Sequence, residues 1–315
     1  PALAHVSLTA THNEEKVTLD LATATVKVAA GTTARVYTLR YTLTEQGQTT
    51  ASNEVEVKVV VKNNLEVDPI TIPASNTPST RGRDKELGNI LNGVKINDEQ
   101  PTLDKVMITV PTPATPKRAG AAVPYIDPLT GKVILPPAVP HGTYNLTYQV
   151  CDAAQGEAQH CERQTLALVV DKNAIEAQED DYTDAVYTVP FSTTEARIIG
   201  DGAPVSVLDN DTLAGLSVTP SQVEIVEVTG DGQVHIDRNT GYITVGANAS
   251  IGEHTLTYKI KEKGTDNLSQ AATVKVVVKN KVTFDSIPST SVNPSTDKNT
   301  PATPIDVIAN TKING

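Results

Sequence analysis

Two cysteines, Cys151 and Cys161, are the residues whose spacing most directly suggests chemistry. They flank one turn between two runs of alternating apolar and polar residues, where cross-strand partners approach to disulfide distance. By this alternation both side chains lie on the outward face, so two unpaired surface thiols are the alternative to a disulfide. A disulfide would predict an oxidising, extracytoplasmic location. Zinc is not predicted, because only His160 lies nearby and the spacing of a four-ligand site is missing.

A run of acidic residues near the middle of the chain is a candidate cation site. Its carboxylates are Asp171, Glu176, Glu179, Asp180, Asp181 and Asp184. Calcium prefers such oxygen ligands, but Lys62 and Lys279 occupy the matching junctions elsewhere in the sequence. We therefore predict no metal and no cofactor for the repeat. Calcium at this one junction is the alternative, with all of these carboxylates except Glu176 as candidate ligands.

No catalytic motif is present in the sequence. There is no nucleophile elbow, phosphate-binding glycine loop or metalloprotease helix motif. The six histidines show no ligand-like pairing. His254 falls on an inward face where the related stretches have Tyr37 and Tyr144, so a packed histidine is expected. We predict no catalytic residues and no enzymatic activity.

These residues belong to a stretch that occurs three times. Its most complete copy covers residues 142–170, and its relatives begin at Arg35 and Gly252. Apolar residues such as Tyr144 and Tyr148 alternate with polar ones, which is the pattern of a strand with one buried face. Each copy is therefore predicted to form a long β-hairpin with one face in water.

A second shared motif is an Asp followed by Thr-Gly, at 127–131 and at 237–241. This is turn chemistry, in which the glycine supplies a positive φ. The first copy has Ala24 at the glycine position, so its turn is expected to differ.

Length and composition fit a chain of small β-domains. The 315 residues carry a marker tyrosine about every 110 residues, and units of this size can each bury a core. There is no Trp and there are only two Phe, which suits thin β-sandwiches. The net charge of −11 is spread along the chain, so no basic face for nucleic acid is predicted. No apolar run approaches the ~20 residues that span a bilayer, so membrane insertion is not predicted.

Several shared motifs resemble a known family. They are Val207-Leu208-Asp209-Asn210-Asp211-Thr212-Leu213-Ala214-Gly215, Val218-Thr219-Pro220-Ser221-Gln222-Val223, Asp237-Arg238-Asn239-Thr240-Gly241, Thr255-Leu256-Thr257-Tyr258 and Val150-Cys151-Asp152. They are similar to the tandem immunoglobulin-like or cadherin-like repeats of giant surface adhesins from Bacteroidetes-type bacteria. The resemblance implies secretion, an extended stalk or filament, and roles in attachment, biofilm or gliding. It also implies O-glycosylation at Thr212 and Ser286.

The repeat divides the chain into four segments. Residues 1–62 are the C-terminal part of a first immunoglobulin-like repeat, 63–172 and 173–280 are complete repeats, and 281–315 are the N-terminal part of a further repeat. The predicted fold class is all-β, with tandem immunoglobulin-like β-sandwich modules in an elongated array. The partial end segments have two explanations. Either the sequence is excerpted from a longer tandem chain, or the half-repeats of different molecules complete each other by strand complementation.

The expected function is structural. We expect a stalk or filament segment of an adhesin on the bacterial cell surface, extracellular and without catalysis. Its partners would be neighbouring repeats of the same chain or other copies of itself, and its surface ligand is not identified by the sequence. The alternatives are a pilus-like subunit that polymerises head to tail through its incomplete terminal repeats, and an accessory module of a secreted enzyme.

Overall fold

The computed structural model describes residues 5–77, 83–200, 202–284, 308 and 311–314. In these residues the chain forms β-strands and short 3-10 turns, and no α-helix. It divides into two compact units, Pro1–Pro116 with Gly120–Asp171 and Lys117–Ala119 with Lys172–Gly315. Each copy of the repeated hairpin contributes to a hydrophobic cluster of its own. The predicted all-β class, built of sandwich modules, is confirmed.

The first hairpin carries a small core. Its segment consists of β1 (Val6–His12), β2 (Val17–Asp20), β3 (Thr25–Val28), β4 (Arg35–Glu45) and β5 (Val55–Val61), with β1-β4-β5 in one sheet and β2-β3 in another. Val17, Tyr37 and Leu39 are its buried residues. Valines at positions 26, 28, 55 and 60 are exposed, so this segment presents apolar surface to solvent.

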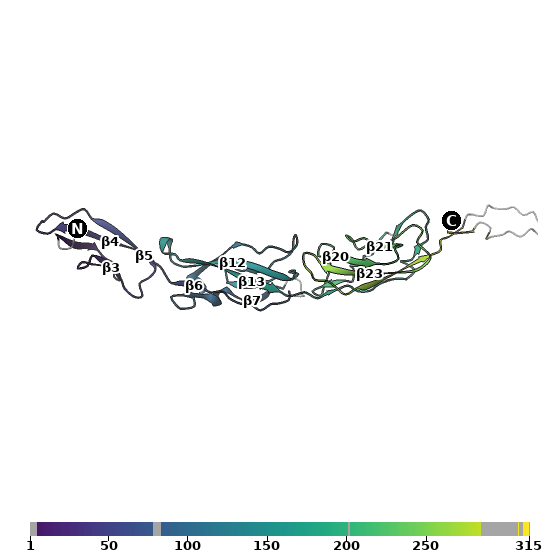
Figure 1. Ribbon diagram of the computed structural model, residues 1–315, viewed down its shortest axis with the longest axis horizontal. Coiled ribbons are helices and arrows are strands. Elements are labelled where there is room, and N and C mark those ends of the chain that lie inside the picture. Colours follow the sequence, from purple (N-terminus) through teal and green to yellow (C-terminus); the bar gives the residue numbers. More distant parts are fainter. Residues whose placement is uncertain (1–4, 78–82, 201, 285–307, 309–310, 315) are drawn as a thin grey trace, which may run out of the picture. The chain divides into compact units, whose positions relative to one another are not determined.

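The second hairpin belongs to a β-sandwich (Figure 1). Its strands are β6 (Leu65–Val67), β7 (Lys85–Asn89), β8 (Val94–Ile96), β9 (Val106–Thr112), β10 (Tyr125–Ile126), β11 (Lys132–Leu135), β12 (Gly142–Asp152) and β13 (Cys161–Val170). The 3-10 turns are η2 (Ile90–Gly93), η3 (Leu103–Lys105) and η4 (Gly156–Ala158). One sheet has the order β13-β12-β9 and another β10-β11-β7, while β6 pairs with β8.

The alternation predicted for this hairpin is confirmed. Tyr144, Leu146, Tyr148 and Val150 are each no more than 2% exposed, whereas Thr143 and Asn145 are exposed. The buried residues share a core with Val133 and Leu135 of the other sheet. Burying one such side chain contributes about 1.5–3 kcal/mol, so a one-residue register slip, which would expose the whole set, is strongly disfavoured.

The third hairpin organises the second unit. The strands are β14 (Ile175–Glu176), β15 (Asp180–Tyr182), β16 (Val189–Pro190), β17 (Arg197–Ile198), β18 (Thr212–Leu213), β19 (Leu216–Ser217), β20 (Val223–Thr229), β21 (Val234–Ile236), β22 (Ile243–Val245), β23 (Gly252–Glu262) and β24 (Ala272–Lys279). The main sheet has the order β15-β24-β23-β20, with β16 also on β24. Smaller sheets are β17-β22-β21 and β14-β18-β19. Both β15 and β16 run parallel to β24, whereas the β23–β24 hairpin is antiparallel.

The Asp-to-glycine turn has a left-handed residue at the same position in all three repeats. Gly131 and Gly241 have φ of 72° and 78°, and their N–H groups donate to Asp127 O and Asp237 O. Ala24 takes the same left-handed conformation, with φ of 54°. The expected difference of the first turn is therefore not found in its backbone conformation at this position. The turn persists despite a backbone cost of about 1–2 kcal/mol for a residue with a Cβ.

Asparagines close the first strand pair of the second repeat and of the segment that follows β24. Asn97 donates its N–H to Asn64 O (2.8 Å) and accepts on Oδ1 from Asn64 N–H (2.9 Å). After β24, β25 (Val282–Phe284) pairs with β26 (Thr311–Ile313), and Asn314 makes the same two bonds with Lys281. Positive φ at Asn97 and Asn314 suits a residue that tolerates the left-handed region. The same local structure thus opens both segments.

Candidate functional site

Cys151 and Cys161 are joined by a disulfide across the second hairpin. They are direct partners in the antiparallel register of β12 and β13. Cys151 is 5% exposed, although its alternation predicted the outward face. In the sheet Cys151 lies between two strands, paired with Cys161 of β13 and with Met107 of β9. The prediction of two outward-facing sulfurs is therefore wrong for Cys151.

A buried carboxylate, Asp152, follows the disulfide at the end of β12. It is fully buried, and its Oδ1 accepts N–H groups of Ala154 and His160, at 3.3 and 3.0 Å. Its Oδ2 accepts from Asn63 Nδ2 at 2.6 Å. Three donors thus satisfy the charge, as a buried carboxylate requires. Asp152 ties residue 63, where the chain begins this module, to the far end of the central strand.

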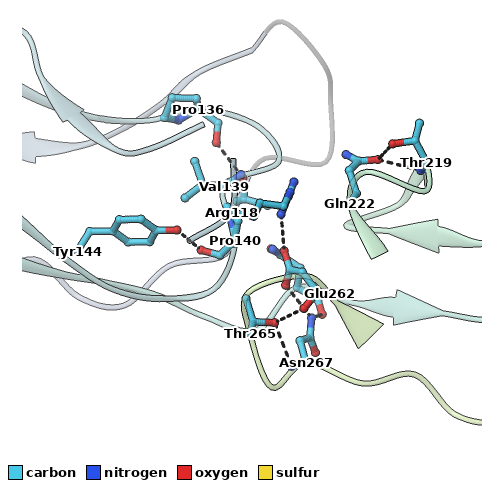
Figure 2. Close-up of polar contacts among 12 residues, drawn as sticks. Arg118, Pro136, Val139, Pro140, Tyr144, Thr219, Gln222, Glu262, Thr265 and Asn267 are labelled. Atoms are coloured by element: carbon cyan, nitrogen blue, oxygen red, sulfur yellow. Dashed lines mark hydrogen bonds and ion pairs between the residues drawn. The ribbon is translucent and has the colours of Figure 1, made fainter. Parts of the chain in front are cut away.

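Glu262, the last residue of β23, has the corresponding place in the second unit (Figure 2). It is 1% exposed, and its Oε2 accepts from Asn267 Nδ2 at 3.2 Å. The same Nδ2 donates to Asn173 O at 2.9 Å, and Arg118, which groups with this unit, lies 3.8 Å from Oε1. Neither acid was predicted from the sequence, since a single charged residue ending a strand is ordinarily exposed. Both have a structural role, because donors of the fold bond to Asp152 and to Oε2 of Glu262.

An aromatic side chain near the start of each long strand bonds to the carbonyl four residues earlier. Tyr37 Oη donates to Thr33 O (2.8 Å) and Tyr144 Oη to Pro140 O (2.7 Å; Figure 2). His254, 3% exposed, places Nε2 at 2.7 Å from Ser250 O and Nδ1 at 2.5 Å from Asp231 Oδ2. The expectation of a packed inward histidine is confirmed.

This correspondence predicts the effect of exchanging the side chain. His254→Tyr should keep the bond to Ser250 O and stay within about 1 kcal/mol of the parent in unfolding free energy, because a tyrosine fills this position in both sister repeats. His254→Leu should lose about 1–3 kcal/mol, because Ser250 O loses its bond from the buried ring. Urea unfolding followed by circular dichroism would compare the two. A His254→Tyr variant as unstable as His254→Leu would contradict the equivalence.

The carboxylates considered for calcium do not form one site. In the part of the chain that the structure describes, no three His, Cys, Asp or Glu residues are grouped to hold a metal ion. Alternation along β15 turns Asp180 into the core, whereas Asp181 faces outward and accepts from Thr183 N–H. Glu179 and Asp184 are exposed, and Asp171 belongs to the first unit. The calcium alternative is therefore wrong as a five-ligand set.

Instead, Asp180 meets Asp211 and Tyr258, two residues far from it in the sequence. We call these three residues the buried carboxyl cluster; none is more than 6% exposed. Tyr258 Oη lies 3.1 Å from Asp180 Oδ2 and 3.0 Å from Asp211 Oδ1. Burial, reinforced by the charge of Asp211, raises the pKa of Asp180 to about 7. Burial also raises the pKa of Asp211, to about 6, and the pKa of Tyr258 far above its ordinary value.

Of the two glycosylation candidates, the structure describes only Thr212. Thr212 is half-buried in β18, where it pairs with Glu176 and Ser217. Ser286 lies outside the described residues. Attachment of a glycan at Thr212 stays a prediction.

A groove of about 790 Å³ lies in the first unit. Glu99 and Lys105 are its charged lining residues, and no histidine, cysteine or second carboxylate lines it. Lining of this kind offers no pairing of a nucleophile with a base. Among the described helical turns, none is long and apolar enough to cross a membrane.

Comparisons with known proteins give structural similarity alone. No family model and no curated protein sequence matches the chain. Solved structures that match include the human desmocollin-1 ectodomain (12% identity, TM-score 0.29, 87% of this chain and 55% of that one) and mouse cadherin-23 EC22-24 (14%, 0.28, 89% and 88%). The protocadherin GammaB4 extracellular domain matches at 13% identity and a TM-score of 0.26, over 90% of this chain and 46% of that one. The chain thus spans about half the length of the first and third of these structures. Identities and TM-scores this low support no inference of shared function.

Proposed function

We propose that this chain is a load-bearing segment of an extracellular bacterial surface adhesin, and that its work is mechanical. The observation that carries the proposal is the parallel pairing within the second unit. Asp180, Asp181 and Tyr182 pair with Val274, Lys275 and Val276, and Val189 and Pro190 pair with Val278 and Lys279. Phe191 N–H extends the ladder to Lys279 O, at 2.8 Å. The first and last parts of the module are therefore bonded to each other directly.

Parallel pairing decides how such a module responds to tension. In a parallel pair the start of one strand and the end of the other lie at opposite ends of the ladder. Pulling outward on both then loads all the hydrogen bonds together in shear, whereas pulling a hairpin from its open end breaks them one at a time. A chain that transmits force benefits from the first arrangement. The second repeat has a smaller version of it, the parallel bridge between Ser75 and Val170.

Pulling single molecules of the whole chain would test this role. We expect the module of residues 173–280 to unfold at a higher force than the module of residues 63–172. The first has five parallel residue pairs that resist shear, and the second has one parallel bridge. The Cys151–Cys161 disulfide shows which unfolding event belongs to which module. Reductant should lengthen only the extension of the module of residues 63–172, by about 3.5 Å for each released residue. Equal forces, or a weaker event for the module that reductant leaves unchanged, would contradict the proposal.

A second candidate, a subunit that assembles by strand complementation, is favoured by the exposed apolar residues of the first repeat. Val26 and Val28 are 37% and 48% exposed, whereas Val133 and Leu135, which follow the matching turn of the second repeat, are fully buried. A segment from another copy would bury them and form main-chain bonds at a sheet edge. Light scattering after size-exclusion chromatography distinguishes the candidates. Mass that grows with concentration supports complementation, and a constant monomer mass excludes it.

A further inference from the structure

In the buried carboxyl cluster, the hydroxyl of Tyr258 is surrounded by more acceptor oxygens than it can donate hydrogen bonds to. Five acceptors lie within 3.3 Å of Tyr258 Oη: Val207 O, Gln178 O, Asp180 Oδ2 and both carboxylate oxygens of Asp211. A phenol donates one hydrogen. The remaining close contacts between oxygens are repulsive unless a further proton or a cation lies among them.

The two carboxylates are close to each other as well. Since both contact one phenol oxygen, Asp180 Oδ2 and Asp211 Oδ1 are separated by at most about 6 Å. Gln178 N–H donates to Asp211 Oδ1 at 2.8 Å, and Tyr182 Oη donates to Asp180 Oδ1 at 3.3 Å. These donors are neutral, so they leave the charges of a doubly ionised pair uncompensated.

The other titratable groups around the cluster are acidic or phenolic. Tyr182 lies on β15 with Asp180, and the ring of Tyr187 packs edge-on against that of Tyr182, with 5.3 Å between centroids. The charge of Asp209, in the loop before β18, raises the pKa of Tyr182. Lys275 of the neighbouring strand acts on the outward-facing Asp181. Within the described residues the structure gives neither Asp180 nor Asp211 an ion-pair partner. The cluster therefore concentrates negative charge where water is excluded.

We propose that the third repeat folds around one proton held by the Asp180–Asp211–Tyr258 cluster, so that this module alone loosens as the pH rises toward mildly alkaline values. The proposal does not depend on the stalk function. The pKa values support it in sign. Because burial raises the pKa of both carboxyls in the folded chain, the folded state binds more protons than the unfolded state. Their contribution to stability is complete below their ordinary pKa of 3.8 and is lost as the pH rises through about 6 to 7.

The second repeat provides an internal control. Val94 of β8 precedes Ile96 by two residues, as Asp211, directly before β18, precedes Leu213. Ile96 pairs with Leu65, and Leu213 pairs with Ile175. Tyr148 has the place of Tyr258, six residues after the glycine that starts the long strand. Val94 is 1% exposed, and Tyr148 Oη has no hydrogen-bond partner among the described residues. The site that is apolar in one module is a carboxyl pair in the next.

The test is urea unfolding of the full chain at a series of pH values, read by a short hydrogen-exchange pulse at one fixed pH and mass spectrometry of peptides. Peptides of β23–β24 report the third repeat and those of β12–β13 the second. We expect the β23–β24 midpoint to fall by about 1 M urea between about pH 5 and about pH 8, and the β12–β13 midpoint to stay unchanged. Equal pH dependence of both midpoints would overturn the proposal.

Matched variants locate the effect. Asp180→Asn with Asp211→Asn should abolish the pH dependence of the β23–β24 midpoint, and its persistence would overturn the proposal. Tyr258→Phe should lower that midpoint, whereas Tyr148→Phe should leave the β12–β13 midpoint unchanged or raise it, because it removes a hydroxyl without a partner. If the double variant does not fold, a carbon-13 NMR titration of the aspartate carboxyls in the unmodified chain tests the proposal instead.

A carboxyl that titrates near 7 supports the proposal, and titration of all aspartates near 4 overturns it. Calcium that restores the midpoint at about pH 8 would show that a cation is the natural occupant, and would also overturn it.

Discussion

Gly241→Ala is expected to destabilise the third repeat by about 3 kcal/mol or more. Gly241 has φ of 78°, and a Cβ built there would lie 2.2 Å from Ser206 Oγ. Ser206 cannot turn away freely, because its Oγ donates to Thr240 O at 2.9 Å and accepts from Leu208 N–H at 3.2 Å. The substitution therefore adds backbone strain and breaks buried hydrogen bonds. Urea unfolding of the full chain, with exchange read in peptides of β21 and β22, measures the loss.

Gly232→Ala is the control for this prediction. Gly232 has φ of 77°, but nothing lies within 4 Å of its added Cβ. It should cost only the backbone strain, about 1–2 kcal/mol. Ser206→Ala in the Gly241→Ala background should recover part of the loss, because it removes the colliding oxygen. Equal effects of the two glycine substitutions would refute the contact at Ser206.

Replacing both Cys151 and Cys161 by Ala is expected to lower the stability of the second repeat by up to about 3 kcal/mol, the chain-entropy value for a loop of ten residues. The upper figure applies if the hairpin ends are free in the unfolded chain. Part of the loss should come from the native state, because Cys151 is buried beside Met107. Exchange in peptides of β12–β13 should rise, while β23–β24 stays unchanged. Reductant should raise exchange in the β12–β13 peptides of the parent chain and leave exchange in the variant unchanged. Faster exchange in the reduced variant would show that the loss does not come from the disulfide.

The sequence predicted what depends on the period of a strand. Tyr144, Leu146 and Tyr148 lie inside and their polar neighbours outside, because one residue in two must face the core whatever surrounds it. His254 was placed correctly for the same reason. The period assigns faces within one strand, and it carries no information about which residue of another segment meets that face.

This limit explains what was missed. Along β15, Asp180 and Tyr182 point to one face and Asp181 to the other, so alternation alone places two of the calcium candidates on opposite faces. The meeting of Asp180 with Asp211 and Tyr258 depends on the packing of β15 and the loop before β18 against β23, which no local pattern encodes. Cys151 is buried although its parity is that of the outward face, because alternation does not say what covers a face. Asp152 and Glu262 were missed because their donors lie outside the strands that they end, at Asn63 and at Asn267.

The parallel ladder between β15 and β24 has a further consequence for how this module is made. Nearly the whole repeat separates Asp180 from Val274 in sequence, so their pairing is among the most non-local in the chain. Such contacts form late, because closing a long loop costs entropy before any bond repays it. During synthesis, β15 must remain without its partner until β24 has left the ribosome. The third repeat is therefore expected to be the module most dependent on protection while it is nascent.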